Sequence, residues 1–236
     1  MMLEARDVVA GYGNIEILHR VSVGVHEGKI ACIVGPNGCG KSTLLKTIFG
    51  ILRPTGGKIS FMGEEISSLP PHMLLRRGMS LVLQRRSIFP LMTVLDNLKM
   101  GAYTRKDKQE IEKRLEEVYH MFPILEKKKK QMAESMSGGQ QRMLELGRAM
   151  MLKPKLMLLD EPSAGLAPVV TQGIFEKIKE MNDQGMTFAI VEQNVRIGLE
   201  MSDYAYVLEL GRNRLEGPAS EIIHDESLAK IYMGRL

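Results

Sequence analysis

Cysteine is scarce in this chain, which has only Cys32 and Cys39 among its 236 residues. The two do not form a CxxC pair, so we expect neither a thiolate metal site nor a dithiol redox motif. So few cysteines are typical of a reducing, cytosolic compartment. A secretory signal is also lacking, because charged side chains occur already at Glu4, Arg6 and Asp7.

Long apolar runs are lacking too. None approaches the roughly 18 residues that a membrane-spanning helix requires, so we expect any role at a membrane to be peripheral. Basic residues are not interleaved with aromatic ones, which argues against a nucleic-acid partner. The net charge is a modest +4, and part of it is the lysine run at 127–130. We interpret this run as a solvated helix end or turn, with contact to anionic lipid headgroups as the alternative.

The chain contains neither an internal repeat nor a low-complexity linker, which favours one domain spanning 1–236. Strands and helices are expected to alternate, and this pattern is typical of an α/β fold with a mostly parallel sheet. Between about 93 and 148, apolar residues recur every three or four positions, which predicts a helical insertion. Strands are predicted at 3–9, 21–25, 30–34, 58–61, 79–83, 155–160, 187–191 and 204–210, and turns at 11–14 and 63–65.

A glycine-rich loop lies between the apolar run at 30–34 and a helix-like run that starts at Leu44. Glycines allow backbone N–H groups to turn toward phosphate oxygens, and the helix N-terminus favours the same anion. Lys41 would then reach the β- and γ-phosphates, and Ser42 would hold Mg²⁺. The alternative is a glycine turn that binds nothing. The candidate nucleotide-binding residues are Gly35, Pro36, Asn37, Gly38, Cys39, Gly40, Lys41, Ser42 and Thr43.

Two acids, Asp160 and Glu161, follow a run of four apolar residues. At the end of a buried strand, Asp160 could orient Mg²⁺ beside the phosphates, and Glu161 could polarise a water molecule. Alone, the pair could equally be a helix cap or a surface feature. Together with the glycine-rich loop, it predicts a nucleotide-hydrolysing site.

A second anion-binding segment is predicted where Ser137, Gly138, Gly139 and Gln140 open a helix. Ser137 is suited to be the N-cap, and an ordinary capped helix is the alternative. Two glycines before a helix also form a nest for an anion. One nucleotide does not need two such nests, whereas a head-to-tail dimer would close the loop of one subunit and the nest of the other on one ATP.

These segments occur in the same order as in the ATP-binding cassette of ABC transporters, which the sequence resembles over essentially its whole length. Residues 35–43 resemble the Walker A loop, and 156–160 resemble Walker B, followed by Glu161 as the catalytic glutamate. Residues 136–140 resemble the LSGGQ signature, with Met136 in place of leucine. Two further positions match: Tyr12, the aromatic residue that stacks on adenine, and Gln84, the glutamine of the Q-loop.

The resemblance implies a P-loop NTPase core, with a mixed, mainly parallel sheet and an N-terminal antiparallel β part. The core would span 1–84 and 155–236, with a helical subdomain at about 85–154. It further implies Mg²⁺ held by Ser42, Gln84 and Asp160, and a signature segment that acts in trans on the partner's ATP. The implied partners are transmembrane permease subunits, a second ATPase subunit and, indirectly, an external solute-binding protein, all served from the cytoplasmic face.

Two departures from the family pattern indicate a subfamily. Ala167 stands where aspartate is usual, and Gln193 occupies the position of the switch histidine. Both are similar to the F-type ATPase subunit of branched-chain amino acid permeases, and the urea and amide permease ATPases look much alike. A glutamine amide can donate to the γ-phosphate but cannot titrate. The alternative is that Gln193 is a neutral surface residue without a role. A further hypothesis is that the chain works in a heterodimer with a histidine-bearing partner, which would give two unequal ATP sites.

Other NTPase classes fit less well. An ABC protein acting on DNA would need a long coiled-coil insertion, and a translation-type ABC protein would carry two cassettes. A GTPase would need an Asn-Lys-x-Asp motif, which the sequence does not contain. We therefore expect an ATPase subunit that powers an ABC importer of branched-chain amino acids, with a urea or amide importer as the alternative. A further alternative is a binding module that uses ATP only as a switch.

Overall fold

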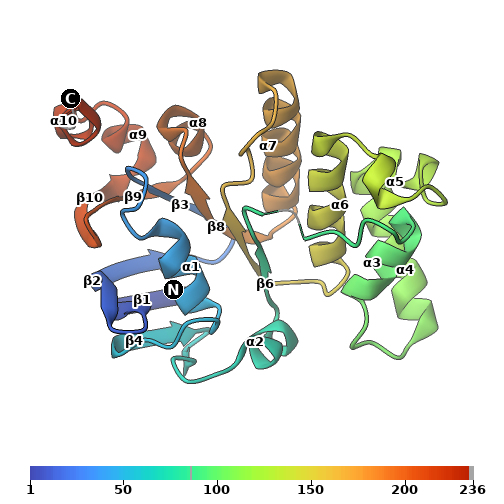
Figure 1. Cartoon of the computed structure of the whole chain (residues 1–236), viewed down its shortest axis with the longest axis horizontal. Helices are drawn as coiled ribbons and strands as arrows, with labels where there is room; N and C mark the ends of the chain where they lie inside the picture. The colour runs from blue at the N-terminus through green and yellow to red at the C-terminus, as the bar shows by residue number, and fades with distance from the viewer. Residues whose placement is uncertain (86, 234–236) are drawn as a thin grey trace.

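The computed structural model describes residues 1–85 and 87–233. Two β-sheets lie toward one end of the molecule, and a lobe of helices lies at the other (Figure 1). The ranges expected for the helical subdomain and the core include 86 and 234–236, which lie outside the described residues. Among the described residues, no helix has the length and apolar character needed to span a membrane.

The N-terminal sheet is antiparallel, as expected, with the strand order β2-β1-β4-β5. The turn predicted at 11–14 was wrong in extent, because the strand continues through Tyr12 and only Gly13 and Asn14 turn. Gly11 allows this tight pairing, since a Cβ there would lie 1.9 Å from the carbonyl oxygen of Ile15. The strands are β1 (Leu3–Tyr12), β2 (Ile15–Val25), β4 (Gly56–Phe61) and β5 (Glu64–Glu65), the last of which had been predicted as part of a turn.

The second sheet has six strands in the order β10-β9-β3-β8-β7-β6, and all but β10 are parallel. Its central strands are buried along their whole length, which explains why they are continuous apolar runs in the sequence. The strands are β3 (Ile30–Val34), β6 (Met79–Val82), β7 (Leu156–Asp160), β8 (Thr187–Glu192), β9 (Tyr204–Glu209) and β10 (Arg212–Pro218).

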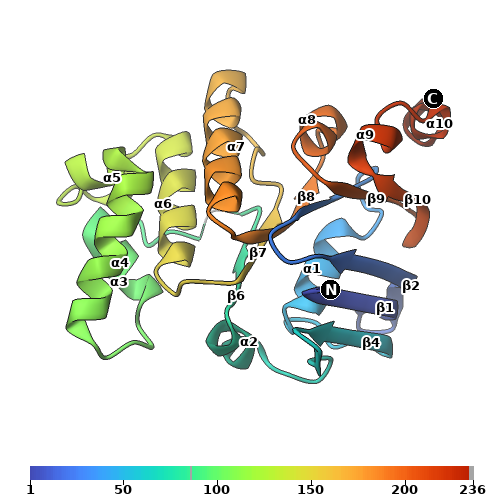
Figure 2. The same ribbon diagram turned by 180° about the vertical axis from the view of Figure 1, so that it is seen from behind.

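Helix α1 lies between the two sheets, and its apolar residues join one core with both of them (Figure 2). On the opposite face, α8, α9 and α10 cover β3 and β9. The helices on the core are α1 (Lys41–Ile48), α2 (Pro71–Arg77), α7 (Pro168–Asp183), α8 (Val195–Glu200), α9 (Ala219–Ile222) and α10 (Glu226–Met233).

The helical lobe is continuous with the sheet through α6, which stands beside α7 in both views (Figure 1 and Figure 2). One apolar cluster joins Leu115 and Val118 of α4, Leu144 of α6 and Leu159 of β7. The segments of the lobe are α3 (Val94–Gly101), α4 (Lys108–Met121), α5 (Pro123–Lys127), the 3₁₀ turn η1 (Ala133–Ser135) and α6 (Gly138–Met150). The predicted helical insertion is thus observed, and its first helix begins at Val94.

Candidate functional site

The strand order places most of the predicted site residues at one edge of the sheet. β6, β7, β8 and β3 are consecutive and parallel, so their carboxyl ends lie side by side. Gln84, Glu161, Gln193 and Gly35 follow these four strands in turn. Ligands of such sheets bind at this edge. A cleft of about 400 Å³ opens there, lined by Tyr12, Ile17, Asn37, Gly38, Gly40, Lys41, Ser42, Thr43, Gln84, Glu161 and Gln193.

The loop at 35–43 has the conformation that phosphate binding requires. Gly38 and Gly40 have φ of 78° and 105°, a region that side chains with a Cβ rarely enter. A Cβ on Gly35 would lie only 2.2 Å from the carbonyl oxygen of Leu208, so only glycine fits there. Gly40 precedes α1 and has no side chain to cap it, which leaves the N–H groups of the first turn available to an anion.

Lys41 lies in the mouth of this loop. Its ammonium donates to the carbonyl oxygens of Gly35 at 2.8 Å and Pro36 at 3.1 Å. The residue is only 5% exposed, so its charge is concentrated toward the cleft. Phosphate oxygens could replace the two carbonyls as charge-assisted acceptors.

Ser42 and Asp160 meet across the edge of the sheet. The hydroxyl of Ser42 donates to Oδ1 of Asp160 at 2.8 Å. Burial raises the pKa of Asp160, while the hydrogen bond from Ser42 and the charges of Lys46 and Lys41 oppose this shift. A hydroxyl beside a carboxylate is a donor set of hard oxygens, which fits Mg²⁺.

Glu161 stands next to Asp160 in a strained conformation, with φ of 48°. Its carboxylate accepts a hydrogen bond of 2.5 Å from the side-chain amide of Gln84. Burial is the main cause of its raised pKa; the charge of Lys41 opposes the shift and that of Asp160 adds to it. A raised pKa suits a carboxylate that takes a proton from water. Gln84, expected as a Mg²⁺ ligand, contacts Glu161 through its nitrogen, so only its amide oxygen could face a cation.

Gln84 is tied to the helical lobe, as the family resemblance implies, through a buried arginine whose contact the sequence did not reveal. The guanidinium of Arg142, on α6, donates to the carbonyl oxygens of Leu83 and Gln84 at 2.9 and 3.0 Å. Arg142 is buried and forms an ion pair of 2.9 Å with Glu145. A shift of α6 would therefore be transmitted to the backbone at Gln84.

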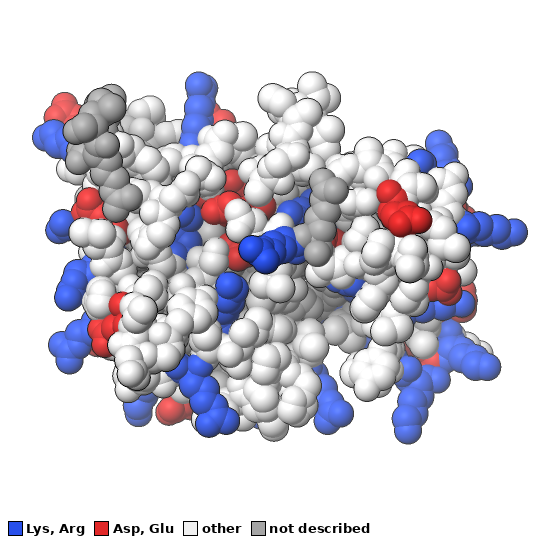
Figure 3. Space-filling view, in the orientation of Figure 1, with Lys and Arg blue, Asp and Glu red and all other residues white. Residues whose placement is uncertain are grey.

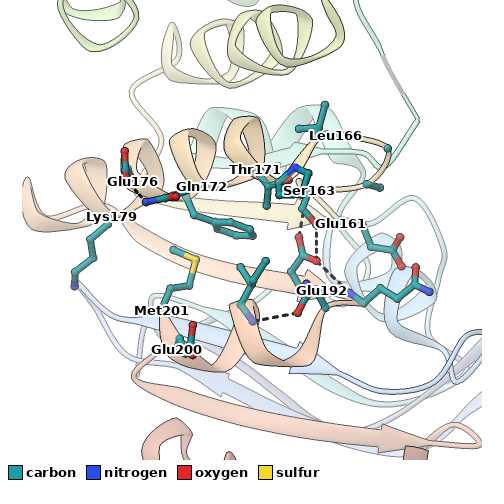
Figure 4. Close-up of a pocket in the computed structure, with 17 residues that line it drawn as sticks. Glu161, Ser163, Leu166, Thr171, Gln172, Glu176, Lys179, Glu192, Glu200 and Met201 are labelled. Carbon is teal, nitrogen blue, oxygen red and sulfur yellow. Dashed lines mark hydrogen bonds between the residues drawn. The ribbon is translucent and has the colours of Figure 1, made fainter.

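Tyr12 and Gln193 frame the cleft from two sides. Tyr12, at the end of β1, is 46% exposed, and the ammonium of Lys46 lies 6.0 Å from the centre of its ring. An exposed ring face is suited to stack on a nucleobase. Gln193, directly after β8, borders both this cleft and a neighbouring cavity, whose lining is drawn in Figure 4.

The segment at 137–140 does not line the cleft. Ser137 is the N-cap of α6, as predicted, and accepts a hydrogen bond of 3.4 Å from the backbone of Gln140. Gly139 lies so close to α7 that a Cβ there would be 2.2 Å from Cγ1 of Val170. Within the described part of the chain, Ser137, Gly138, Gly139 and Gln140 thus form a separate feature on the other side of α7 from the cleft.

Sequence reasoning missed two residues beside the site, Ser163 and Glu192. Glu192 is the last residue of β8 and is fully buried, and its carboxylate accepts hydrogen bonds from Ser163. An acid that directly follows four apolar residues in a buried strand is a signal that could have been noticed. Its partner could not, since 29 positions separate the two residues in the chain.

Comparisons with known proteins agree on one family. The sequence model described as "ABC transporter" matches residues 18–164. The chain is 42% identical to the high-affinity branched-chain amino acid transport ATP-binding protein BraG of Pseudomonas aeruginosa, over 99% of this chain and 100% of BraG. It is 40% identical to the probable branched-chain amino acid transport ATP-binding protein LivF of Archaeoglobus fulgidus, over 99% of each chain. The lipopolysaccharide export system ATP-binding protein LptB of Escherichia coli is 35% identical, over 98% of this chain and 97% of LptB.

Solved structures show the same likeness. The ADP conformation of MJ1267, an ATP-binding cassette of an ABC transporter, superposes with a TM-score of 0.90 at 31% identity, covering 99% of both chains. MJ0796, a bacterial ABC transporter cassette solved as a dimer, superposes with a TM-score of 0.80 at 25% identity, covering 92% of this chain and 99% of that one.

Proposed function

The chain belongs to the ATP-binding family of ABC transporters, and from this premise we propose that it hydrolyses ATP to drive an importer of branched-chain amino acids. The observation that carries the proposal is the arrangement of Lys41, Ser42 and Glu161 around one cleft, with Asp160 hydrogen-bonded to Ser42 behind it. The cargo class is supported by BraG and LivF, whose similarity extends over nearly the full length of each chain.

Each residue of the cleft has a distinct role in this proposal. Tyr12 stacks on adenine, and the backbone of the 35–43 loop together with Lys41 holds the phosphates. Ser42, Asp160 and the amide oxygen of Gln84 are the oxygen ligands for Mg²⁺, which would neutralise phosphate charge when bound. Glu161 accepts a proton from the attacking water, and Gln193 donates its amide to the γ-phosphate. Such catalysis depends on positioning and charge stabilisation.

We propose that the functional unit contains a second ATPase subunit. Ser137 to Gln140 are separated from the cleft of their own chain by α7, which supports a role in trans on the partner's ATP. MJ0796 has been solved as a dimer, which favours the same arrangement. Because Ala167 and Gln193 depart from the family pattern, the partner is expected to be a histidine-bearing cassette.

The permease subunits are proposed to dock on the helical lobe. A groove of about 300 Å³ there is lined by Phe89, Met100 and Tyr103, among others. Phe89 and Tyr103 are large aromatic residues, yet they are 40% and 79% exposed. The groove also borders Ser87, which follows the Q-loop closely, so a docked loop could act on Gln84. We treat 1–84 and 155–236 as the core and 85–154 as the lobe that receives the permease.

A charge introduced into this groove should separate docking from catalysis. Tyr103→Glu is expected to reduce co-purification with the permease subunits at least about tenfold, because a carboxylate would be buried against the partner without a counter-ion. ATP affinity of the isolated subunit should stay unchanged. Leu210→Glu is the matched control, since Leu210 is 64% exposed and connects β9 to β10, which lie at the end of the molecule away from the helical lobe (Figure 1). Equal permease recovery from both variants would contradict the proposed docking surface.

The proposed function is tested by reconstituting the chain with its permease subunits and partner ATPase in vesicles. ATP-dependent uptake of leucine, isoleucine or valine, presented with the solute-binding protein, is the expected result. Uptake of urea or a short amide instead would contradict the cargo assignment but not the ATPase role. ATP binding without release of phosphate would contradict the ATPase role. Equal hydrolysis by the purified chain and by the mixed complex would count against a heterodimer.

The charge distribution fits this set of partners. On the face shown in Figure 3, acidic side chains lie between the basic ones, and the basic side chains project mostly around the edge of the molecule. Such interspersed charge gives this face no extended basic surface.

A further inference from the structure

Glu192 is a fully buried carboxylate that none of the roles above uses. It ends β8, immediately before Gln193, and is 0% exposed. One carboxylate oxygen accepts from the backbone N–H of Ser163 at 3.1 Å. The other accepts from the hydroxyl of Ser163 at 2.9 Å and from the backbone N–H of Gln193 at 3.2 Å (Figure 4).

These hydrogen bonds have to stabilise a charge away from water. Burial raises the pKa of Glu192, and the donors on Ser163, Asn194 and Gln193 act in the opposite direction. Hydrogen bonds to an ionised acceptor are shorter and stronger than those between neutral groups. A buried carboxylate is costly, so the two loops that supply these donors are held to it.

The two loops carry the groups that face the γ-phosphate in the proposed function. Ser163 lies two residues after Glu161 in the loop that follows β7. Gln193 begins the loop that follows β8. Glu192 therefore links the loop that carries the base to the loop that carries the switch residue.

The first of these loops is only partly packed, because Leu166 contacts the core whereas Gly165, Ala167 and Pro168 are exposed. The segment from Ser163 to Pro168 borders a cavity of about 880 Å³ between α7 and α8, which Figure 4 shows from the side. Two of its backbone hydrogen bonds are local, from Ala164 to Glu161 and from Leu166 to Ser163. Across to β8, the backbone N–H of Glu161 donates to the carbonyl oxygen of Val191 at 2.9 Å, and the contact of Ser163 with Glu192 adds a side-chain link further along the loop.

Resting on the proposed function, we infer that Glu192 is a positioning residue for ATP hydrolysis. Through its hydrogen bonds with Ser163 and with the backbone N–H of Gln193, it fixes the positions of Glu161 and Gln193 relative to each other. It does not touch the nucleotide. Its loss should therefore slow the chemical step while leaving ATP binding almost unchanged.

Glu192→Gln tests this with the least change in volume. The amide nitrogen would replace one accepting oxygen and would face a backbone N–H group, so one of the two loops is released. We expect kcat of the reconstituted transporter to fall about 10- to 100-fold, as for a small misplacement of catalytic groups. KM and the dissociation constant for ATP should stay within about twofold of the wild-type values. Glu200→Gln is the matched control, because Glu200 lines the same cavity but is exposed and pairs with Arg196.

Substitutions of Ser163 keep the test decisive even if the Glu192 variant folds poorly. Ser163→Ala should lower kcat in the same direction, and Ser163→Thr, which keeps the hydroxyl, should recover much of that loss. Because both residues act through one contact, the double variant Glu192→Gln/Ser163→Ala should be no slower than the slower single variant. Thermal unfolding of each variant shows whether a lower kcat results only from a less stable fold.

Three outcomes overturn the inference. They are a kcat for Glu192→Gln equal to that of Glu200→Gln, a loss confined to KM or to thermal stability, and independent, multiplying effects in the double variant. Absence of hydrolysis by the wild-type complex would overturn the proposed function together with this inference. Wild-type hydrolysis beside an unaffected Glu192→Gln variant overturns the inference alone.

Discussion

Replacing Glu161 with glutamine is expected to lower ATP hydrolysis at least about 100-fold while leaving ATP binding intact, the range typical of a lost general base. Glutamine has nearly the same volume as glutamate, and its amide oxygen can still accept the hydrogen bond from Gln84. What disappears is the group that takes a proton from water. Because hydrolysis reopens the proposed dimer, the variant should also accumulate as an ATP-bound dimer.

Phosphate release measures the first effect, and size-exclusion chromatography with ATP measures the second. Glu176→Gln is the control, since it removes a similar carboxylate from the exposed face of α7. Turnover by the Glu161 variant at the wild-type rate would remove Glu161 from its proposed role. Loss of ATP binding as well would mean that the residue supports the loop rather than the chemistry.

Lys41→Met is expected to have the opposite effect, because it should weaken ATP binding itself rather than the hydrolysis of bound ATP. The side chain keeps its length, but the ammonium of Lys41, a residue that is only 5% exposed, is removed from the mouth of the loop. A charge-assisted hydrogen bond contributes about 1.5–3 kcal/mol. ATP affinity should therefore fall about 10- to 150-fold, since each 1.4 kcal/mol is tenfold.

Nucleotide titration with a fluorescent ATP analogue measures this loss. Lys58→Met is the control, because Lys58 on β4 has a side chain that is 78% exposed and pairs only loosely, at 3.8 Å, with Glu65. Unchanged affinity in the Lys41 variant would show that the loop backbone alone binds the phosphates. Taken together, the two variants separate the binding half of the cleft from its catalytic half.

The parts of the site that the sequence predicted are those with a local cause. A buried parallel strand is an apolar run on both faces, so 30–34, 155–160 and 187–191 were recognisable without neighbours. The residues that follow such runs lie at the sheet edge, which is why Lys41 and Glu161 could be assigned to one site. Ser137 was predictable as an N-cap for the same reason, because capping depends on the next three residues.

The parts that were missed depend on distant partners or on weak local patterns. β10 alternates between exposed and half-buried positions with charged residues, and α2 is only seven residues long, so neither has a clear apolar period. The extension of β1 to Tyr12 requires the carbonyl oxygen of Ile15 to approach Gly11, which no composition rule describes. The contacts of Arg142 with Gln84 and of Glu192 with Ser163 join segments that only the folded sheet brings together.

The strand order has a consequence for how the chain is made. β3, which carries the 35–43 loop, pairs with β8 and β9, and these strands span 187–192 and 204–209. During synthesis on the ribosome, the first of these neighbours emerges only after most of the chain. The antiparallel sheet, by contrast, has all four of its strands by Glu65. An incomplete chain can therefore build its first sheet early but lacks the strands that hold the 35–43 loop in place. The strand at 30–34 has to be kept from aggregating until β8 and β9 are synthesised.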